Sequence, residues 1–322
     1  MDMGADDALA LAYALRCQRL HVLAVTLVSG NVPVAQAFAN AHLVIQAAGV
    51  STGPTVSVGA SRPLKREPIH AEQVHGPDGM GGITSLAGPT GAPRYPQPQM
   101  QPPSEDAPDA IRRLLLDSPG QITVVTTGPL TNLALLHRRD PSALLAAREV
   151  ICMAGAFRVP GNVTPAAEYN VYADPHAARE LLHSGAPITF VGLDVTTRVA
   201  LMREQLAAWC AEHPSPLGQL LVDCTAFCME FHQRVEGYNG MAMHDPLAVA
   251  FAADRTLLQL EPMRVDVETE GLLTAGMTLA DLRSRNVPKQ GVPVSVAVEV
   301  DAARFMADFR GALFGQLNSP SA

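Results

Sequence analysis

The chain opens with an acidic turn that runs directly into an apolar segment with helical character. Asp2, Asp6 and Asp7 lie close together, Gly4 allows a tight turn between them, and the alanine- and leucine-rich segment 8–12 follows at once. Negative charge is favoured at a helix start, so a well-capped helix is one interpretation. Three carboxylates on one turn also repel one another, which leaves a metal or sugar site equally open. Oxygen ligands alone favour a hard ion, Ca²⁺ or Mg²⁺, over zinc.

Composition limits the class of protein. The chain has 322 residues, 48% of them hydrophobic and 17% charged, which is typical of a globular protein with a large core. The formal net charge of −8 argues against nucleic acid or an anionic membrane as the main partner. We see no apolar stretch long enough for a membrane span and no pattern typical of a signal peptide. Five widely spaced cysteines indicate reduced thiols, so we expect a cytoplasmic protein.

Apolar strands alternate with helical segments along most of the chain. We predict strands at residues 22–28, 55–58, 122–125, 149–154, 188–193, 263–269 and 294–300, and helices at 7–19, 34–48, 106–117, 246–253 and 301–316. The run 22–28 is typical of a strand buried on both faces of a parallel sheet. The alternation predicts an α/β fold, with an open, mostly parallel, Rossmann-like sheet and helices on both faces. No linker divides the chain, so we expect residues 1–322 to form a single domain.

Two regions depart from this alternation. Residues 59–108 are rich in proline and glycine, and a loop of this length in a compact domain is usually a lid or a binding loop, or else disordered. We therefore predict a long active-site loop region at 59–108. Residues 200–245 are mostly helical, with a break near Pro214 and Pro216, and we expect them to flank the pocket.

Polar residues gather where the predicted strands end. Ligands of open α/β sheets bind beyond the carboxyl ends of the strands. Asn31, Thr127, the segment 153–170 and the pair His244-Asp245 all follow such ends. Each alone has an ordinary explanation, such as a turn residue or a helix cap. Their joint placement predicts an active site at this edge of the sheet.

Several short motifs occur in a fixed order along nearly the whole chain. They are Asp2-Met3-Gly4-Ala5-Asp6-Asp7, Gly30-Asn31, His75-Gly76, Thr127-Gly128-Pro129-Leu130-Thr131-Asn132, the loop from Asn162 to Glu168-Tyr169-Asn170, Gly192-Leu193-Asp194-Val195-Thr196 and His244-Asp245-Pro246. In these motifs the chain resembles the inosine–uridine-preferring nucleoside hydrolases, Ca²⁺-dependent enzymes that cleave ribonucleosides into ribose and free base. The first motif is similar to the second part of the family signature D-x-D-P-G-x-D-D. The resemblance implies a hydrolase (an N-glycosidase) that acts in purine or pyrimidine salvage.

The resemblance also implies a role for each site residue. Ca²⁺ would be bound by the carboxylates of Asp2, Asp7 and Asp245 and by the backbone carbonyl of Thr127. The ribose hydroxyls would be held by Asp6, Asn31, Met153, Asn162, Glu168 and Asn170. Asp2 would also be the general base for a water held by Ca²⁺. His244 would be the general acid at the leaving base, and His75 would line the nucleobase side.

These residue types suit the chemistry of the reaction. Breaking the bond between ribose and nitrogen builds positive charge on the sugar, as in the oxocarbenium-like transition state of glycoside hydrolases. Carboxylates and amide oxygens around the ribose would stabilise that charge. Ca²⁺ lowers the pKa of a bound water only modestly, so a carboxylate base is still needed. An imidazole can protonate or hydrogen-bond the leaving base.

Two departures from the family pattern concern the first residues. Met3 stands where the family has proline, which we interpret as a mild change in a turn. The family's first aspartate and the strand before it have no counterpart ahead of Asp2, so we expect the first central strand to be missing and the chain to be a truncated version. The alternative function is then a catalytically weak or inactive ribose- or nucleoside-binding protein.

A rival enzyme class is a metal-dependent phosphotransferase or phosphatase built on the acidic turn. That chemistry would use Mg²⁺ and a lysine or arginine near the phosphate. Arg158 is the only cation close to the predicted site loops, which makes this rival weak. The expected partner is a small-molecule ribonucleoside, and the resemblance implies a homodimer or homotetramer. The preferred nucleobase stays open.

Overall fold

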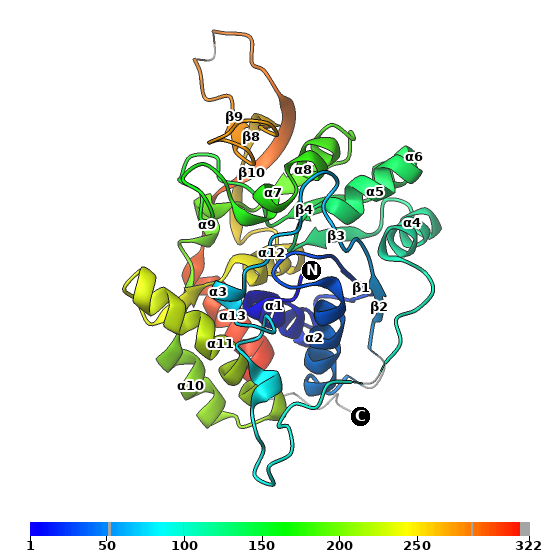
Figure 1. Ribbon diagram of the computed structural model, residues 1–322. Coiled ribbons are helices and arrows are strands. Elements are labelled where there is room, and N and C mark those ends of the chain that lie inside the picture. Colours follow the sequence, from blue (N-terminus) through cyan, green and yellow to red (C-terminus); the bar gives the residue numbers. More distant parts are fainter. Residues whose placement is uncertain (51–52, 99, 285, 316–322) are drawn as a thin grey trace.

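The computed structural model describes residues 1–50, 53–98, 100–284 and 286–315, in which strands and helices alternate (Figure 1). The strands are β1 (Ala24–Leu27), β2 (Thr55–Val58), β3 (Thr123–Thr126), β4 (Glu149–Cys152), β5 (Ile188–Phe190), β6 (Ala200–Met202), β7 (Gly240–Ala242), β8 (Leu258–Val267), β9 (Thr278–Ala280) and β10 (Val292–Val300). The helices are α1 (Ala5–Arg16), α2 (Val34–Ala47), α3 (Glu72–His75), the 3₁₀ helix η1 (Ile83–Ser85), α4 (Ala107–Asp117), α5 (Thr131–Arg139), α6 (Pro141–Leu145), α7 (Tyr169–Ala173), α8 (Pro175–Leu182), α9 (Leu193–Thr196), α10 (Arg203–Glu212), α11 (Pro216–Val235), α12 (His244–Ala253) and α13 (Ala302–Phe314).

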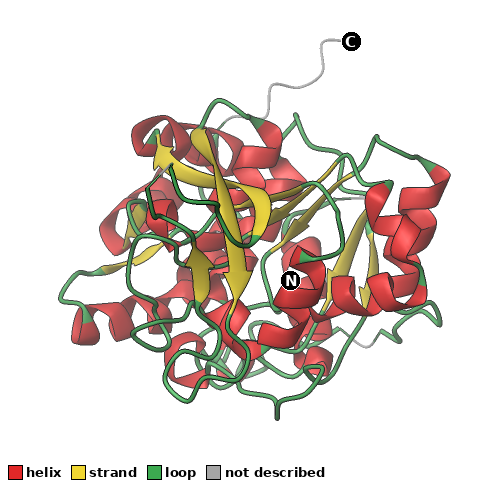
Figure 2. Ribbon diagram, turned by 90° about the horizontal axis from the view of Figure 1, so that it is seen from above, coloured by secondary structure: helices red, strands yellow, loops and turns green. Residues whose placement is uncertain are grey.

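The strands form a mostly parallel main sheet with the order β3-β4-β5-β10-β8-β9. Strands β3, β4, β5 and β10 are parallel neighbours, whereas β8 and β9 join in antiparallel pairing. A separate parallel pair, β1-β2, lies beside this sheet, and β6-β7 form a small antiparallel pair. Helices surround the strands (Figure 2). The predicted α/β fold with a mostly parallel sheet is confirmed, but the single sheet is divided between β1 and β3.

Side chains of β4 alternate between two apolar cores. Val150 and Cys152 pack with residues of α4, α5 and α8, whereas Ile151 packs with residues of α1, α2, α11, α12 and α13. Successive side chains of a strand point to opposite faces, so both faces of the sheet must be covered. The helices that supply the two cores do this, as the sequence predicted.

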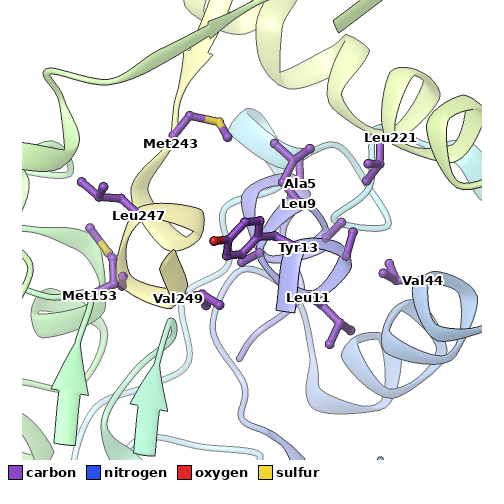
Figure 3. Close-up of a cluster of buried hydrophobic side chains, with 14 of the residues drawn as sticks. Ala5, Leu9, Leu11, Tyr13, Val44, Met153, Leu221, Met243, Leu247 and Val249 are labelled. Atoms are coloured by element: carbon purple, nitrogen blue, oxygen red, sulfur yellow. The ribbon is translucent and has the colours of Figure 1, made fainter. Parts of the chain in front are cut away.

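Helix α1 lies inside the larger core and packs against α2, α11, α12 and α13. Leu9, Leu11 and Tyr13 are fully buried, and Figure 3 shows them among side chains of the surrounding helices, such as Leu221 and Leu247. Burial of so much apolar surface stabilises the position of α1 strongly. The acidic residues at its N-terminal end are therefore held on a rigid element.

Three expectations from the sequence need correction. Residues 59–108 are not one irregular loop, because they contain α3, η1 and the start of α4. Residues 200–245 hold the pair β6-β7 in addition to the two predicted helices. Strand β1 is not buried on both faces, since Ala24 and Thr26 are only half-buried. Across the described residues, none of the helices combines the length and apolarity that crossing a membrane requires.

Candidate active site

The acidic turn adopts a strained backbone just before α1. Met3 has a φ of 53°, in the left-handed region that residues with a side chain rarely adopt. The N–H of Gly4 donates a hydrogen bond to Oδ2 of Asp7 over 2.9 Å. A Cβ on Gly4 would lie 2.6 Å from Nδ2 of Asn31 and 2.8 Å from Nδ1 of His75. Proline cannot adopt a positive φ, so Met3 is a larger change than the mild one we predicted.

Asp6, Asp7 and Asp245 form a buried acidic cluster. One carboxylate oxygen of each lies within 4.8 Å of those of the other two. Asp245 comes from the first turn of α12, which packs against α1 and so brings residues far apart in sequence together. Carboxylates this close are stable when buried only if they are protonated or share a cation. The cluster therefore fits the predicted metal site, with Asp6 as a further member that the sequence assigned to the ribose.

Asp2 lies beside this cluster in a tight backbone cage. Its Oδ2 accepts a hydrogen bond from the N–H of Asn31 over 2.7 Å, and its Oδ1 is buried without a partner. A Cβ on Gly30 would lie 2.0 Å from Asp2 Oδ2, and one on Gly128 would lie 2.7 Å from Oδ1. Glycine is thus required on both sides of Asp2 by close approach. The cage fixes the carboxylate and leaves one oxygen available.

Burial raises the pKa of every aspartate in this site. The pKa of Asp2 lies well above its usual value because of burial and the charge of Asp7. Burial raises the pKa of Asp6 to about 6 and, with the charge of Asp6, raises that of Asp7. Asp245 has a pKa well above its usual value because of burial and its three acidic neighbours. Without a cation, protons would replace the missing positive charge.

Thr127, Met153 and Asn170 converge next to the cluster, at the carboxyl ends of β3 and β4. The hydroxyl of Thr127 donates to Oδ1 of Asp7 over 2.7 Å. Nδ2 of Asn170 donates to the carbonyl of Met153 over 3.0 Å and to that of Thr127 over 3.3 Å. Nδ2 of Asn31 reaches Oδ2 of Asp7 over 3.3 Å. These contacts bring together five residues that the sequence placed in one site.

Glu168 and Asn162 are occupied by backbone contacts. Glu168 caps α7, where its carboxylate accepts from the N–H groups of Asn170, Val171 and Gly155 at 2.8–3.1 Å. Burial raises the pKa of Glu168 to about 7. Oδ1 of Asn162 accepts from the N–H of Tyr169 over 3.0 Å, and Asn162 is exposed. Both residues shape the loop before α7, and their predicted contact with ribose stays a prediction.

Two histidines from different elements lie near each other at the site. Nδ1 of His75, on α3, accepts a hydrogen bond from the N–H of Ala5 over 3.1 Å and lies 3.9 Å from Oδ1 of Asp6. Nδ1 of His244, on α12, lies 2.7 Å from the hydroxyl of Thr196. Burial lowers the pKa of each histidine to about 4. Both rings are therefore neutral near pH 7.

His232 is a residue that the sequence analysis missed. Burial is the main cause of the pKa shifts of Asp6, His75 and His244. A charge on His232 shifts all three pKa values as well, so the His232 ring on α11 lies near these residues. The ring of Tyr238 lies beside it, with centroids 5.6 Å apart. His232 and Tyr238 lie a few positions before the motif at 244–246 in the sequence. This concentration of rings beside a predicted site motif is the signal that could have identified His232 as a site residue.

The side chain of Arg158 forms an ion pair with Glu261. Its guanidinium lies 2.6 Å from the carboxylate of Glu261, and both side chains are about half-exposed. No arginine or lysine is therefore supplied by this loop to the buried acidic cluster. The phosphotransferase rival loses its one candidate cation.

Comparison with known proteins decides the family. A family model described as inosine-uridine preferring nucleoside hydrolase matches residues 1–307. The chain belongs to this family. The pyrimidine-specific ribonucleoside hydrolase RihA of Citrobacter koseri is 33% identical over 308 residues, which cover 95% of this chain and 93% of that protein.

Solved structures agree with this nucleoside hydrolase assignment. The plant nucleoside hydrolase PpNRh1 superposes with a TM-score of 0.89 and 33% identity, covering 98% of this chain and 97% of the other. The purine-preferring ribonucleoside hydrolase from Gardnerella vaginalis gives 0.86 and 31%, covering 98% and 96%. The chain is thus a ribonucleoside N-glycosidase, as its motifs predicted, and the binding-protein alternative is not favoured.

Proposed function

We propose that the acidic cluster binds one Ca²⁺ ion and that the residues around it hydrolyse the N-glycosidic bond of a ribonucleoside. The observation that carries the proposal is the burial of four aspartates, two of which, Asp2 and Asp6, keep an unpartnered Oδ1. Buried carboxylates without partners are costly, and a cation offsets that cost. Every candidate ligand is an oxygen atom, which is the donor that Ca²⁺ takes in proteins.

The proposed ligands are the carboxylates of Asp2, Asp7 and Asp245 and the carbonyl of Thr127. Support comes from the hydrogen bond between Thr127 and Asp7, which keeps the two residues together. When bound, the ion would offset the repulsion among the aspartates and make a neighbouring water a better nucleophile. Asp6 stays at the ribose in this proposal, because its free oxygen faces His75 rather than a backbone donor.

The ribose is proposed to lie among Asp6, Asn31, Met153, Asn162, Glu168 and Asn170. Asp6 is the strongest member, since its Oδ1 has no hydrogen-bond partner among the residues that the structure describes. Negative and dipolar groups there would stabilise positive charge that develops on the sugar ring. Glu168 contributes through its charge more than through new hydrogen bonds, because backbone N–H groups already occupy both of its oxygens.

Asp2 is the proposed general base. Burial and the charge of Asp7 raise its pKa in the metal-free site, and a bound cation would lower that pKa again, so the assignment rests on the position of its free oxygen. The N–H of Asn31 holds one oxygen in place, and the other has no partner. That free oxygen can accept the proton that the attacking water loses.

His244 and His75 are proposed to face the nucleobase. Departure of the base leaves negative charge on its ring nitrogen, which a hydrogen-bond donor or acid stabilises. The pKa of His244, lowered by burial to about 4, means that its ring is rarely charged at neutral pH. A general-acid role therefore requires that the negative charge building up on the leaving base favour the protonated ring in the transition state.

The test is a panel of ribonucleosides incubated with the purified protein, with release of reducing sugar as the readout. The relatives include pyrimidine-specific and purine-preferring hydrolases, so the panel contains uridine, cytidine, inosine and adenosine. Release from at least one of them, abolished by Asp2→Asn, is the expected result. Binding of a nucleoside without any release would favour the ribose-binding alternative instead. Cytoplasmic location and a homodimer or homotetramer are further proposals, checked by cell fractionation and light scattering.

A further inference from the structure

The hydroxyl of Thr196 lies 2.7 Å from Nδ1 of His244, although the two residues are 48 positions apart in the sequence. Thr196 is fully buried, whereas His244 is half-buried. Thr196 is also the last residue of the motif at 192–196, which supplies none of the proposed metal ligands or ribose contacts. The contact joins this motif to the site through the ring of His244.

The short antiparallel pair β6-β7 brings these two residues together. Strand β6 begins at Ala200, close after Thr196, and β7 ends at Ala242, close before His244. Ala200 pairs with Ala242, and a further backbone hydrogen bond of 2.9 Å extends the pairing toward the two residues. Helix α9 also contacts α12 (Figure 1). The backbones that carry Thr196 and His244 are therefore held at a fixed separation.

Helix α9 is itself anchored to the loop that follows β4. The carboxylate of Asp194 accepts hydrogen bonds from the N–H of Phe157 over 2.9 Å and from the N–H of Arg158 over 2.8 Å. The apolar residues on either side of Asp194 are buried in the core that contains α1. Threonine is branched at Cβ, which restricts its side chain to few rotamers. The hydroxyl of Thr196 is thus a rigidly placed partner for His244.

The buried hydroxyl decides which nitrogen of His244 carries the proton. A neutral imidazole has one donor nitrogen and one acceptor nitrogen, and a hydroxyl can act as either partner. Among the residues that the structure describes, the Thr196 hydroxyl has no hydrogen-bond partner other than His244. A proton on Nδ1 would leave the buried O–H of Thr196 without an acceptor, which is costly. Donation from Thr196 to Nδ1 pairs the hydroxyl and places the ring proton on Nε2.

We infer that Thr196 is a positioning residue that donates to Nδ1 of His244 and thereby presents the Nε2–H of that ring to the leaving base. The inference rests on the proposed place of His244 beside the nucleobase. Nε2 of His244 forms no hydrogen bond with the described part of the chain, so its N–H is available to a substrate. The departing base carries negative charge on a ring nitrogen, and an N–H donor that is already oriented stabilises this charge without reorganisation.

Three variants separate this role from a structural one. Thr196→Val keeps the branched shape of the side chain but removes the hydroxyl, and Thr196→Ser keeps the hydroxyl but removes the methyl group. Thr197→Val is the matched control, because Thr197 is exposed and its hydroxyl donates to the carbonyl of Leu193 instead of to the site. All proteins are measured with Ca²⁺ present, after circular dichroism shows a native spectrum.

The first measurement is the imidazole ¹⁵N spectrum of His244 at pH 8, where an ordinary histidine ring is neutral. We expect a protonated Nε2 and an unprotonated, hydrogen-bonded Nδ1 in the wild type, in Thr196→Ser and in Thr197→Val. In Thr196→Val the Nδ1 resonance should move to the position of a nitrogen without a donor. A proton on Nδ1 of the wild-type protein would overturn the inference, and this result needs no variant to fold.

The second measurement compares kcat on uridine and inosine with kcat on p-nitrophenyl riboside, whose leaving group needs no donor. Thr196→Val should lower kcat on the natural nucleosides roughly 3- to 10-fold, the effect of one neutral hydrogen bond, with little change on p-nitrophenyl riboside. Thr196→Ser should recover most of the rate, and Thr197→Val should lose none. An equal loss on both substrate types, or no recovery with serine, would overturn the inference. If the wild type hydrolyses no nucleoside, the proposed function fails, while the nitrogen assignment still shows whether Thr196 donates to His244.

Discussion

Nδ1 of His75 accepts a hydrogen bond from the main-chain N–H of Ala5 over 3.1 Å. An acceptor nitrogen carries no proton, so the ring proton of the neutral histidine must lie on Nε2. Ala5 directly precedes Asp6 in the acidic turn. The contact thus links the orientation and tautomer of a histidine on α3 to the backbone of the turn that holds the proposed ribose ligand.

We predict that His75 is a neutral Nε2–H tautomer at pH 7 and titrates near pH 4. Burial disfavours the charged ring and lowers its pKa to about 4, and the Ala5 contact selects the tautomer. The measurement is a pH titration of the imidazole ¹⁵N shifts by NMR. His183, which is exposed, serves as the reference within the same spectra. A titration of His75 above pH 6, or a protonated Nδ1, would show that our assignment is wrong.

The substitution Asp7→Asn should abolish metal binding and turnover together. It keeps the shape of the side chain but removes one of the charges that the ion is proposed to balance. Metal binding is measured by calorimetry with Ca²⁺ and by the luminescence of bound Tb³⁺. Asp117→Asn, at an exposed position on α4, is the matched control and should change neither. Nucleoside hydrolysis at the wild-type rate in Asp7→Asn would place the metal site elsewhere.

The substitution His244→Gln should slow hydrolysis of natural nucleosides by roughly 10²–10⁴-fold if His244 assists the leaving base. The same substitution should affect p-nitrophenyl riboside far less, because that leaving group needs no protonation. The comparison of kcat on the two substrates is the readout. An equal loss on both would assign His244 a positioning role only.

Removing metal should make stability depend on pH in an unusual direction. Burial raises the pKa of Asp6 from 3.8 to about 6, so the folded state binds more protons than the unfolded state between these values. Stability contributed by protonated Asp6 is therefore present at low pH and is lost as pH rises from about 4 to about 6, on the order of 2–3 kcal/mol. The other buried aspartates act in the same direction. His75 and His244, whose pKa values are lowered, oppose them over a similar range.

The metal-free protein should on balance lose stability as pH rises through this range, because raised acids outnumber lowered histidines. Denaturant unfolding at several pH values in the presence of a chelator gives the slope. Asp6→Asn should flatten that slope, and Ca²⁺ should remove most of it. A metal-free protein that gains stability steadily up to pH 7 would contradict the charge balance described for the site.

Local patterns in the sequence were enough to place most elements. The run Thr55–Val58 is a strand with the predicted bounds, and helix breaks near Pro214 and Pro216 separate α10 from α11. Turn and cap chemistry acts over a few residues, so the sequence displays it directly. The strand-end rule likewise brought Thr127, Met153 and Asn170 to one place, and the structure has them in contact.

Long-range pairing could not be read in the same way. The contact of His75 with the acidic turn spans 70 positions, and the place of His232 depends on how α11 packs against α1. The pair β6-β7 is also set by its partners rather than by its own three-residue strands. Register and pairing are properties of two segments together, which a single sequence shows only through recurring motifs.

This nucleoside hydrolase is proposed to release ribose from a ribonucleoside through a cation-dependent acidic site. The most direct measurement is the initial rate of reducing-sugar release from uridine and from inosine by protein that is first stripped with a chelator and then titrated with Ca²⁺. Release should be absent in the stripped protein, should be restored by Ca²⁺ in proportion to occupancy of one site, and should not be restored in Asp7→Asn. Full release from the stripped protein, or none at saturating Ca²⁺ from any nucleoside, would contradict this proposal.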